Sequence, residues 1–184
     1  PDKDIPIDKE TQLENWDCPE AIEFDRFLNI ILYTKKNNGK LPDGYDSREE
    51  NNVHDGSNQL DEATAQELQQ KLSPLIEKDS RFVIVDGFML YWDKKVMDQL
   101  DCKISLMTSY ATLKSRREER QGYHTEGGYW IDPPGYFDKI VWPEYLRLNE
   151  HDDTLEDVLK IDTDKNSIRD MSLIVADRLN KDLR

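Results

Sequence analysis

The chain has 184 residues, a length typical of one domain with its own hydrophobic core. Asp and Glu number 39 against 25 Lys and Arg, which gives a net charge of −14 at pH 7. This balance argues against a nucleic-acid-binding protein and against one that binds anionic membranes, because both functions need a basic surface.

The cysteines and the apolar segments indicate the compartment. Cys18 and Cys102 lie far apart in the sequence and form no metal-binding pattern. Two such residues are typical of buried thiols in a reducing compartment, not of a disulfide framework. The sequence has no apolar run as long as a membrane-spanning helix, and its first residues, PDKDIPIDKE, lack the apolar core of a signal peptide. We therefore expect a cytoplasmic protein.

The first part of the chain predicts two helices separated by an insertion. A D-x-x-E capping box places Asp17 at the start of the first helix, and Gly39 suits its end. Residues 40–61 contain two Asp-Gly pairs and few apolar side chains, so they predict a surface insertion. The second helix is expected over 62–77.

Three apolar segments predict strands. Residues 82–85 form a continuous run rich in β-branched side chains, which is typical of a strand buried on both faces of a parallel sheet. Further strands are expected over 103–107 and 158–162. The remaining helices are expected over 94–100, 109–120, 136–149 and 167–183. Strands that alternate with helices predict an α/β fold, here a three-layer sandwich around a mainly parallel sheet.

Asp86 directly follows the first apolar strand of this series. Open α/β sheets bind their ligands at the carboxyl ends of their strands, so an acid at this point can hold a metal-bound water or a substrate hydroxyl. The alternative is that Asp86 and Gly87 form only the turn that ends the strand.

The most basic segment of the chain runs from Lys114 to Arg120 and holds four cations in seven residues. Arg116 and Arg120 stand four residues apart on one face of the predicted helix, with Arg117 beside them. Like charges at this spacing repel one another and the guanidinium group fits phosphate well, so a bound anion is one explanation. A solvated face neutralised by the neighbouring glutamates is the other.

Two further segments have the composition of a small-molecule site. Residues 121–135 combine glycines and prolines with aromatic side chains, which fits either a lid that excludes water from phosphoryl transfer or an ordinary surface loop. Near the start of the chain, Trp16 offers a flat ring and Asp17 a carboxylate. A capping carboxylate still has a second oxygen for a ligand hydroxyl, so the two roles of Asp17 are compatible.

Together these segments resemble the nicotinamide riboside kinases of fungi and animals. The resemblance is carried by NWDCPEAIEFDRF, VIVDGFML, YATLKSRREERQGY and, above all, IDPPGYFDKIVWPEYLRL. It spans most of the chain apart from residues 40–61, and the related uridine kinases share the fold without the last of these runs. It implies the fold of the P-loop nucleoside kinases. It also implies transfer of the γ-phosphoryl group of ATP, with Mg²⁺, to the 5′-hydroxyl of nicotinamide riboside, which gives nicotinamide mononucleotide for NAD synthesis.

The resemblance implies which residues hold the nucleoside. Trp16 and Asp17 match an aromatic-acid pair whose acid binds the ribose hydroxyls. Arg117 matches an arginine that contacts the ribose. Tyr123 and His124 match lid positions that touch the substrate.

The resemblance also implies the groups that face ATP. Arg116 and Arg120 match arginines of the lid helix that face the phosphates, which makes Arg116 a catalytic candidate. Asp86 takes the place of an acid that follows its strand in the family, and it is the second catalytic candidate. The positions that hold the nucleotide include Tyr123, Asp164, Lys165 and Asn166.

One family motif is missing from this sequence, the P-loop G-x-x-x-x-G-K-[ST]. Its amides cradle the phosphates and its hydroxyl residue holds magnesium, so the sequence assigns no metal ligand. We expect that a first β-loop-α-β unit, which also carries the catalytic base, is absent, that the sequence starting at Pro1 is incomplete, and that the chain alone is inactive. Two other functions stay open, a non-catalytic nucleoside-binding module or partner subunit, and a kinase for another nucleoside such as uridine.

Overall fold

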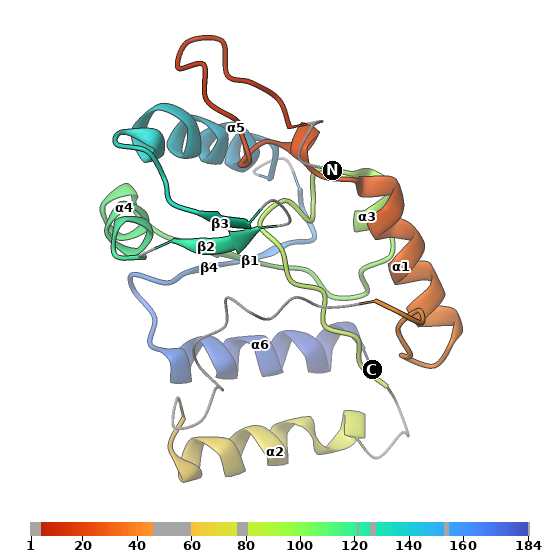
Figure 1. Ribbon diagram of the computed structural model, residues 1–184. Coiled ribbons are helices and arrows are strands. Elements are labelled where there is room, and N and C mark those ends of the chain that lie inside the picture. The colour runs from red at the N-terminus through yellow and green to blue at the C-terminus, as the bar shows by residue number, and fades with distance from the viewer. Residues whose placement is uncertain are drawn as a thin grey trace.

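The fold is described from a computed structural model of the chain (Figure 1). The structure describes residues 5–45, 60–76, 81–120, 122–125, 128–152 and 155–183. Most of the predicted insertion at 40–61 lies outside the described residues, as do residues 121, 126 and 127 of the predicted lid segment.

Helices make up most of the regular structure. They are α1 (Phe24–Lys36), α2 (Glu62–Ile76), α3 (Lys94–Met97), α4 (Tyr110–Glu118), α5 (Trp142–Asp152) and α6 (Ile168–Asp182). The 3₁₀ turn η2 (Pro19–Ala21) precedes α1, and the π-helical turn η4 (Phe137–Val141) leads directly into α5. The predicted helices are therefore confirmed, although the first begins later than expected and that over 94–100 is a single turn.

Side-chain caps explain where three of these helices begin. The hydroxyls of Ser109 and Ser167 accept hydrogen bonds from the backbone N–H groups of Thr112 and Asp170, which fixes the starts of α4 and α6. The carboxylate of Asp93 accepts from Val96 at the start of α3. These caps make the start of α4 a local property of the sequence.

A short parallel sheet lies at the centre of the molecule. Strand β1 (Ile104–Met107) pairs with β4 (Leu159–Asp162), with Ile104 opposite Leu159 and Met107 opposite Asp162. Helix α6 covers the sheet below and α5 lies above it, so the α/β fold with a parallel sheet is confirmed (Figure 1). Strands β2 (Tyr123–Thr125) and β3 (Gly128–Trp130) form a separate antiparallel hairpin beside α4.

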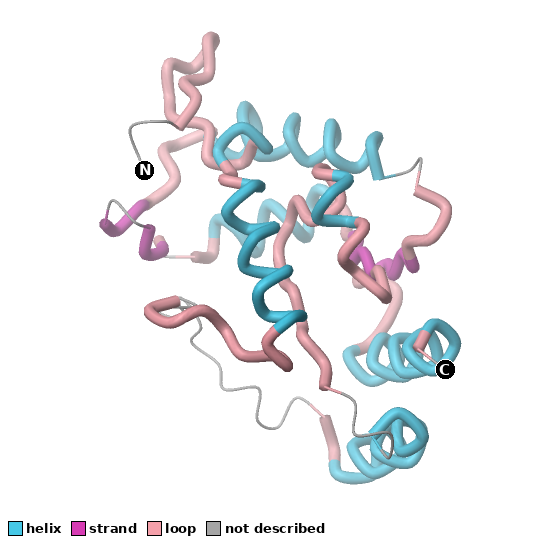
Figure 2. The backbone as a smooth tube through the Cα atoms, turned by 90° about the vertical axis from the view of Figure 1, so that its right-hand side faces the viewer, coloured by secondary structure: helices cyan, strands magenta, loops and turns pink. Residues whose placement is uncertain are grey.

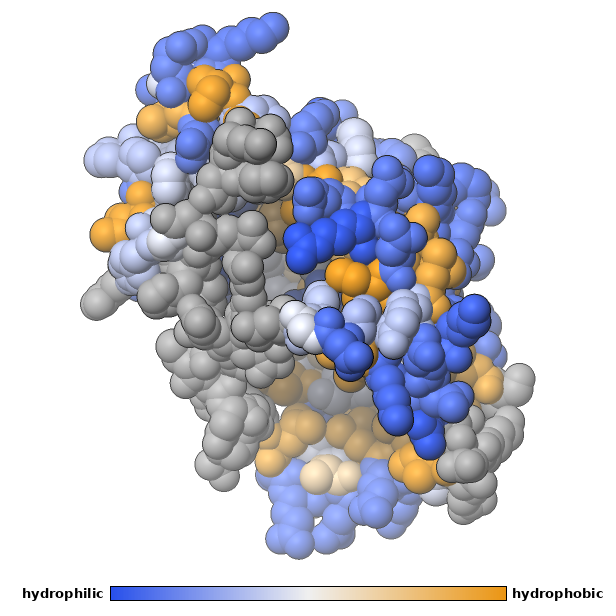
Figure 3. Space-filling view, turned by 45° about the vertical axis from the view of Figure 1, so that its right-hand side comes forward, coloured by the Kyte–Doolittle hydropathy of each residue, from blue (hydrophilic) through white to orange (hydrophobic). Residues whose placement is uncertain are grey.

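Helix α2 forms an outer layer that packs on α6 (Figures 1 and 2). Leu75, in the last turn of α2, is buried, and apolar surface gathers along the side of α2 that faces the rest of the molecule (Figure 3). Two ion pairs, Lys71–Asp177 and Glu67–Arg169, join the helices at their exposed edges. In the part of the chain that the structure describes, no helix is long and apolar enough to cross a membrane.

The predicted strand over 82–85 is wrong. The segment is extended, but no strand among the described residues pairs with it. The prediction was a strand buried on both faces, but Ile84 is 92% exposed and Phe82 is 51% exposed. A strand needs a partner for its backbone N–H and C=O groups, and an apolar sequence cannot supply that partner by itself.

Candidate functional site

One arginine and two aspartates form the centre of the candidate site. The two terminal nitrogens of Arg117 donate to the carboxylate of Asp17, from Nη1 to Oδ1 at 3.0 Å and from Nη2 to Oδ2 at 3.2 Å. Nε and Nη2 donate to the carboxylate of Asp132, at 2.6 Å and 3.2 Å. Both contacts are bidentate, the strongest arrangement that a guanidinium group makes with a carboxylate.

All three side chains are largely shielded from water. The exposed fractions are 10% for Asp17, 17% for Arg117 and 20% for Asp132. Burial raises the pKa of the Asp17 carboxyl, whereas the Arg117 guanidinium acts against this rise because it stabilises the charged form. The nearby negative charges of Asp132 and Glu144 raise the same pKa further. Arg117 is therefore what keeps a charged Asp17 compatible with its position.

Helix α5 and its π-helical start hold the segment that carries Asp17. The hydroxyl of Tyr136, whose side chain is almost fully buried, donates to the carbonyl of Glu14 at 2.8 Å and accepts from the N–H of Trp16 at 3.2 Å. These bonds fix the backbone on both sides of Asn15. The sequence NWD is thus positioned by a residue of the run IDPPGYF.

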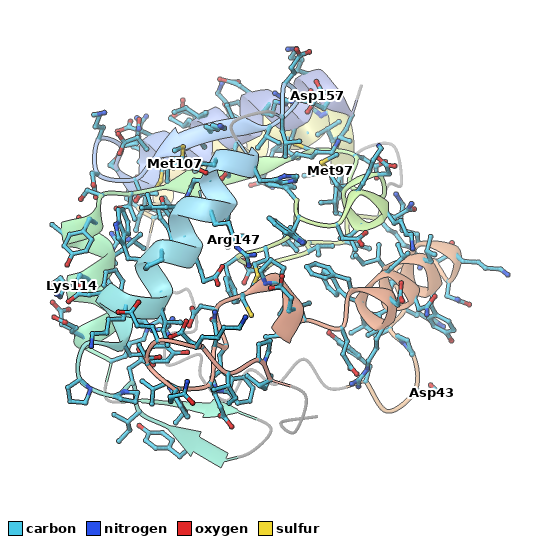
Figure 4. All side chains as sticks on the ribbon, turned by 90° about the horizontal axis from the view of Figure 1, so that it is seen from above. Asp43, Met97, Met107, Lys114, Arg147 and Asp157 are labelled. Atoms are coloured by element: carbon cyan, nitrogen blue, oxygen red, sulfur yellow. The ribbon has the colours of Figure 1, made fainter. Side chains whose placement is uncertain are left out.

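Asn15 adds a second connection to α5. Its side-chain amide donates to Glu144 at 2.8 Å, and its side-chain oxygen accepts from the N–H of Asp17 at 3.1 Å. Arg147 projects from α5 towards η2 and donates to Glu144 and to Glu20 (Figure 4). The start of the chain is therefore attached to α5 by polar contacts on two neighbouring helical turns.

The predicted capping role of Asp17 is wrong. The first helical turn, η2, has Cys18 in the capping position and no side-chain cap, and α1 begins only at Phe24. The carboxylate of Asp17 binds Arg117 instead. The local D-x-x-E pattern could not reveal this, because the competing partner lies 100 residues further along the chain.

Aromatic rings border this ionic cluster. The indole Nε1 of Trp130, in β3, donates to Asp132 at 2.8 Å. The ring of Trp130 lies 6.2 Å from that of Trp16 and 6.0 Å from that of Tyr136, measured between centroids. The hairpin within the predicted lid segment is thus placed against the segment that carries Asp17.

Neither Asp132 nor Tyr136 was predicted from the sequence as a site residue. Both belong to the run that carries most of the resemblance, and Asp132 closely follows a pair of aromatic residues. An acid placed between an arginine-rich helix and a buried aromatic turn is the signal that could have identified it.

The other two arginines of the basic segment are not part of the cluster. Arg116 and Arg120 are exposed, and neither forms an ion pair with another residue that the structure describes. Helix α4 ends at Glu118, so Arg120 lies beyond the helix and the predicted shared helix face is wrong. The helix ends early because the backbone N–H of Arg120 bonds to the carbonyl of Arg117, one residue short of an α-helical bond.

Asp86 lies apart from the cluster, in the lining of a pocket of about 360 Å³. The pocket lies between the start of α1 and the segment 86–90, and its lining is mostly apolar, including Phe27, Phe88 and Met89. Neither Asp17 nor Arg117 lines it. The structure therefore does not bring Asp86 together with the residues predicted to hold the nucleoside.

Three of the residues expected to hold the nucleotide lie directly after β4. Asp164 accepts from the hydroxyl of Thr108 at 2.7 Å and from the N–H of Ser109 at 2.8 Å, and these groups hold the pKa of Asp164 well below its ordinary value. Lys165 pairs with the side chain of Asp162, whose carbonyl accepts from Asn166; these two contacts measure 2.6 Å and 2.8 Å. Asp164 thereby joins the turn after β4 to the start of α4.

The remaining predicted positions lie in the hairpin. Tyr123 and His124 belong to β2, opposite Trp130 and Tyr129 of β3.

Among the described residues, no group of three or more His, Cys, Asp or Glu side chains could hold a metal ion.

Three fungal proteins named nicotinamide riboside kinase are similar to this chain. The protein from Eremothecium gossypii is 39% identical over 148 residues, which cover 78% of this chain and 58% of the relative. The protein from Schizosaccharomyces pombe is 35% identical over 150 residues, 82% of this chain and 63% of the relative. Over about four fifths of its length the chain is thus similar to proteins named nicotinamide riboside kinase.

The protein from Saccharomyces cerevisiae, another nicotinamide riboside kinase, is 36% identical over 149 residues, which cover 78% of this chain and 60% of the relative. The chain thus spans between 58% and 63% of the length of these curated relatives. No family model matches the chain. The resemblance drawn from the sequence is confirmed, and the uridine kinase and the non-catalytic module gain no support from the comparison.

Proposed function

We propose that this chain contributes the nucleoside site of an ATP-dependent kinase that phosphorylates the 5′-hydroxyl of nicotinamide riboside. The supporting similarity is to relatives that are named for this activity. The observation that carries the proposal is the pair formed by Asp17 and Arg117, with Trp16 next to Asp17 in the chain. The fold brings these groups together from segments far apart in the sequence, and both segments belong to the resemblance.

The chemistry of the pair suits a ribose. A carboxylate accepts hydrogen bonds from two neighbouring hydroxyls, and a guanidinium group donates to the same oxygens. In this proposal Asp17 binds the ribose hydroxyls, Arg117 contacts the ribose, and Trp16 offers its ring to the base. Nicotinamide riboside carries a positive charge on its pyridinium ring, and aromatic faces attract such cations.

The phosphate side of the reaction involves other residues. Arg116 and Arg120 are exposed next to the hairpin, and we assign them to the phosphates of ATP, with Arg116 as a catalytic candidate. Tyr123 and His124 in the hairpin would touch the substrate, and Tyr123 also the nucleotide. Asp164, Lys165 and Asn166 would border the adenine. Asp86 is the second catalytic candidate, as an acid beside the unpaired extended segment.

Phosphoryl transfer also requires Mg²⁺, a phosphate cradle and a catalytic base. We assign no residue of this chain to the metal ion. In a P-loop kinase fold, the cradle and the base would come from a β-loop-α-β unit that this sequence does not contain. A strand of such a unit could pair with the apolar residues 82–85, because these residues are extended and exposed and lack a pairing strand among the described residues. The product of the reaction would be nicotinamide mononucleotide, and the reaction would be a step of NAD synthesis in the cytoplasm.

The test is binding of nicotinamide riboside to this chain, measured by isothermal titration calorimetry. Replacing Arg117 by Ala should weaken binding by about 10- to 100-fold, the value of a hydrogen bond to a charged group. Asp17→Ala should weaken it more, because Asp17 is proposed to bind both hydroxyls. Far-UV circular dichroism of each variant establishes that it is folded.

The matched control is Arg178→Ala. Arg178 forms an ion pair with Asp182 in α6, and its side chain is 19% exposed against 17% for Arg117. This variant should bind like the unmodified chain. If folded Asp17→Ala and Arg117→Ala variants bind nicotinamide riboside as tightly as the unmodified chain, the proposed site is wrong.

A further inference from the structure

Asp132 occupies one edge of the Arg117 guanidinium group. A guanidinium group has two edges that can each donate two hydrogen bonds to a carboxylate. One edge consists of Nη1 and Nη2, and the other consists of Nε and Nη2. Asp17 binds the first edge and Asp132 binds the second. Nε lies closest to the side-chain stem, so a bond to Nε fixes the plane of the whole group.

We propose that Asp132 is a positioning residue of the nucleoside site. It holds the plane of Arg117 so that the outer edge of the guanidinium group faces Asp17. A ribose would then meet a preformed pair of groups and would not have to order a long, flexible side chain on binding. This inference rests on the function proposed above, because it concerns how the same site is prepared.

The second contact of Asp132 extends this role to the hairpin. Its Oδ1 accepts from the indole Nε1 of Trp130 at 2.8 Å, and Oδ1 also accepts from Nη2 of Arg117. The ring of Trp130 in turn lies beside that of Trp16. One carboxylate therefore sets the position of Arg117 relative to β3.

A conservative substitution isolates the contact of Asp132 with Arg117. Asparagine has nearly the same shape as aspartate but carries no charge, and its amide NH₂ cannot accept a hydrogen bond from Arg117. Asp132→Asn thus removes the charge and one acceptor while keeping the volume.

The decisive experiment is a double-mutant cycle read by calorimetry with nicotinamide riboside. Asp132→Asn should weaken binding about tenfold, the lower limit for losing a charged hydrogen bond. In an Arg117→Ala background the same substitution should change affinity less than twofold, because a residue that acts through Arg117 has no effect once Arg117 is gone. Equal losses in both backgrounds would overturn the inference, since they would show a role that does not involve Arg117.

Two further variants sharpen the result. Asp132→Glu keeps the carboxylate and should bind more tightly than Asp132→Asn. Asp182→Asn removes the carboxylate of the comparably buried pair in α6 and should leave affinity unchanged. If Asp182→Asn weakens binding as much as Asp132→Asn, the effect is a general loss of stability and the inference is wrong.

A ligand-free measurement separates this inference from the proposed function. If the folded, unmodified chain does not bind nicotinamide riboside, the proposed function fails. The same cycle read by urea unfolding still tests the contact between Asp132 and Arg117. The two substitutions should be non-additive in the unfolding equilibrium, whereas additive effects would overturn the positioning role whatever the ligand.

Discussion

Asp17 and Arg117 depend on each other for their stability in the folded chain. Asp17 as a whole residue is only 7% exposed, and a carboxylate ion buried this deeply is unfavourable without a partner of opposite charge. Removing one member of a buried pair leaves the other as an uncompensated charge, which typically costs about 3 to 5 kcal/mol. Well-packed apolar residues would stabilise the same space at least as well, so stability alone gives no reason for a buried ion pair at this position.

Cys18 allows a prediction at the scale of one residue. Burial raises the pKa of the Cys18 thiol to about 11, and its Sγ donates to the carbonyl of Asn15 at 3.3 Å. Only the thiolate reacts with disulfide reagents, so at pH 8 about one thousandth of Cys18 is in the reactive form. We expect Cys18 to react slowly with Ellman's reagent in the folded protein. The reaction rate should rise as the pH is raised from 7 towards the pKa of Cys18, because the fraction of thiolate rises with it.

The comparison uses the two single-cysteine variants. Cys102→Ser leaves only Cys18, and Cys18→Ser leaves only Cys102, which is more exposed. The Cys102→Ser variant should react more slowly when folded, and both should react at similar rates in denaturant. A fast reaction of Cys18 in the folded chain would contradict its burial.

At the scale of elements, the turn from β3 into α5 organises the site. Gly135 has a φ of +80°, a conformation that favours glycine, and the N–H of Tyr136 bonds to the carbonyl of Pro133. This turn directs Tyr136, Phe137 and Ile140 into the core. The run IDPPGYF therefore supplies both the carboxylate beside Arg117 and the tyrosine hydroxyl that holds residues 14–16.

Tyr136→Phe tests this organisation. The substitution keeps the ring and removes the hydroxyl that bonds to Glu14 and Trp16. The free energy of unfolding should fall by about 1 to 2 kcal/mol, because the buried backbone groups lose their partner. Urea unfolding followed by tryptophan fluorescence measures this.

The matched control is Tyr33→Phe in α1, whose tyrosine is 43% exposed. It should change stability by less than about 0.5 kcal/mol, as surface substitutions usually do. Equal effects of the two substitutions would show that the hydroxyl of Tyr136 does not hold the 14–16 segment.

Helices and strands differed in how far the sequence could predict them. Helices α4 and α6 each begin at a serine that caps a backbone N–H three residues further along the chain, so the local sequence pattern was enough to predict both starts. Strands β1 and β4 were predicted correctly, and each has its partner in the described chain. Residues 82–85 are more apolar than either strand but have no such partner among the described residues, so composition alone gave the wrong result there.

The candidate site was predictable only in part, for a related reason. Trp16, Asp17 and Arg117 came from the resemblance, and the structure brings them together. The contact of Asp132 with Arg117 depends on the antiparallel hairpin of β2 and β3, which lies between the two residues in the chain and folds it back. Helix periodicity cannot predict contacts that arise between elements through such turns.

At the scale of the whole molecule, the exposed apolar segment 82–85 should govern self-association. An extended, unpaired run presents backbone groups that can pair with a second copy. Ile84→Asn should reduce association of this chain in sedimentation velocity experiments without lowering its melting temperature, because Ile84 is 92% exposed. Asparagine leaves the net charge unchanged, so charge repulsion does not contribute to the result.

Ile76→Asn is the control for this experiment. Ile76 ends α2 and is 58% exposed, but it belongs to a helix and not to an extended segment. Its substitution should affect association less than that of Ile84. Equal effects would attribute association to exposed apolar area in general and not to the unpaired segment.

The pairing of β1 with β4 has a consequence for synthesis of the chain on the ribosome. Parallel strands must be joined by a long crossover, and here the crossover contains α4, the hairpin and α5. Because the ribosome adds residues in order, Asp17, Arg117 and Asp132 all emerge before β4 does. The nascent chain can therefore form the ionic cluster before β4 has emerged to pair with β1.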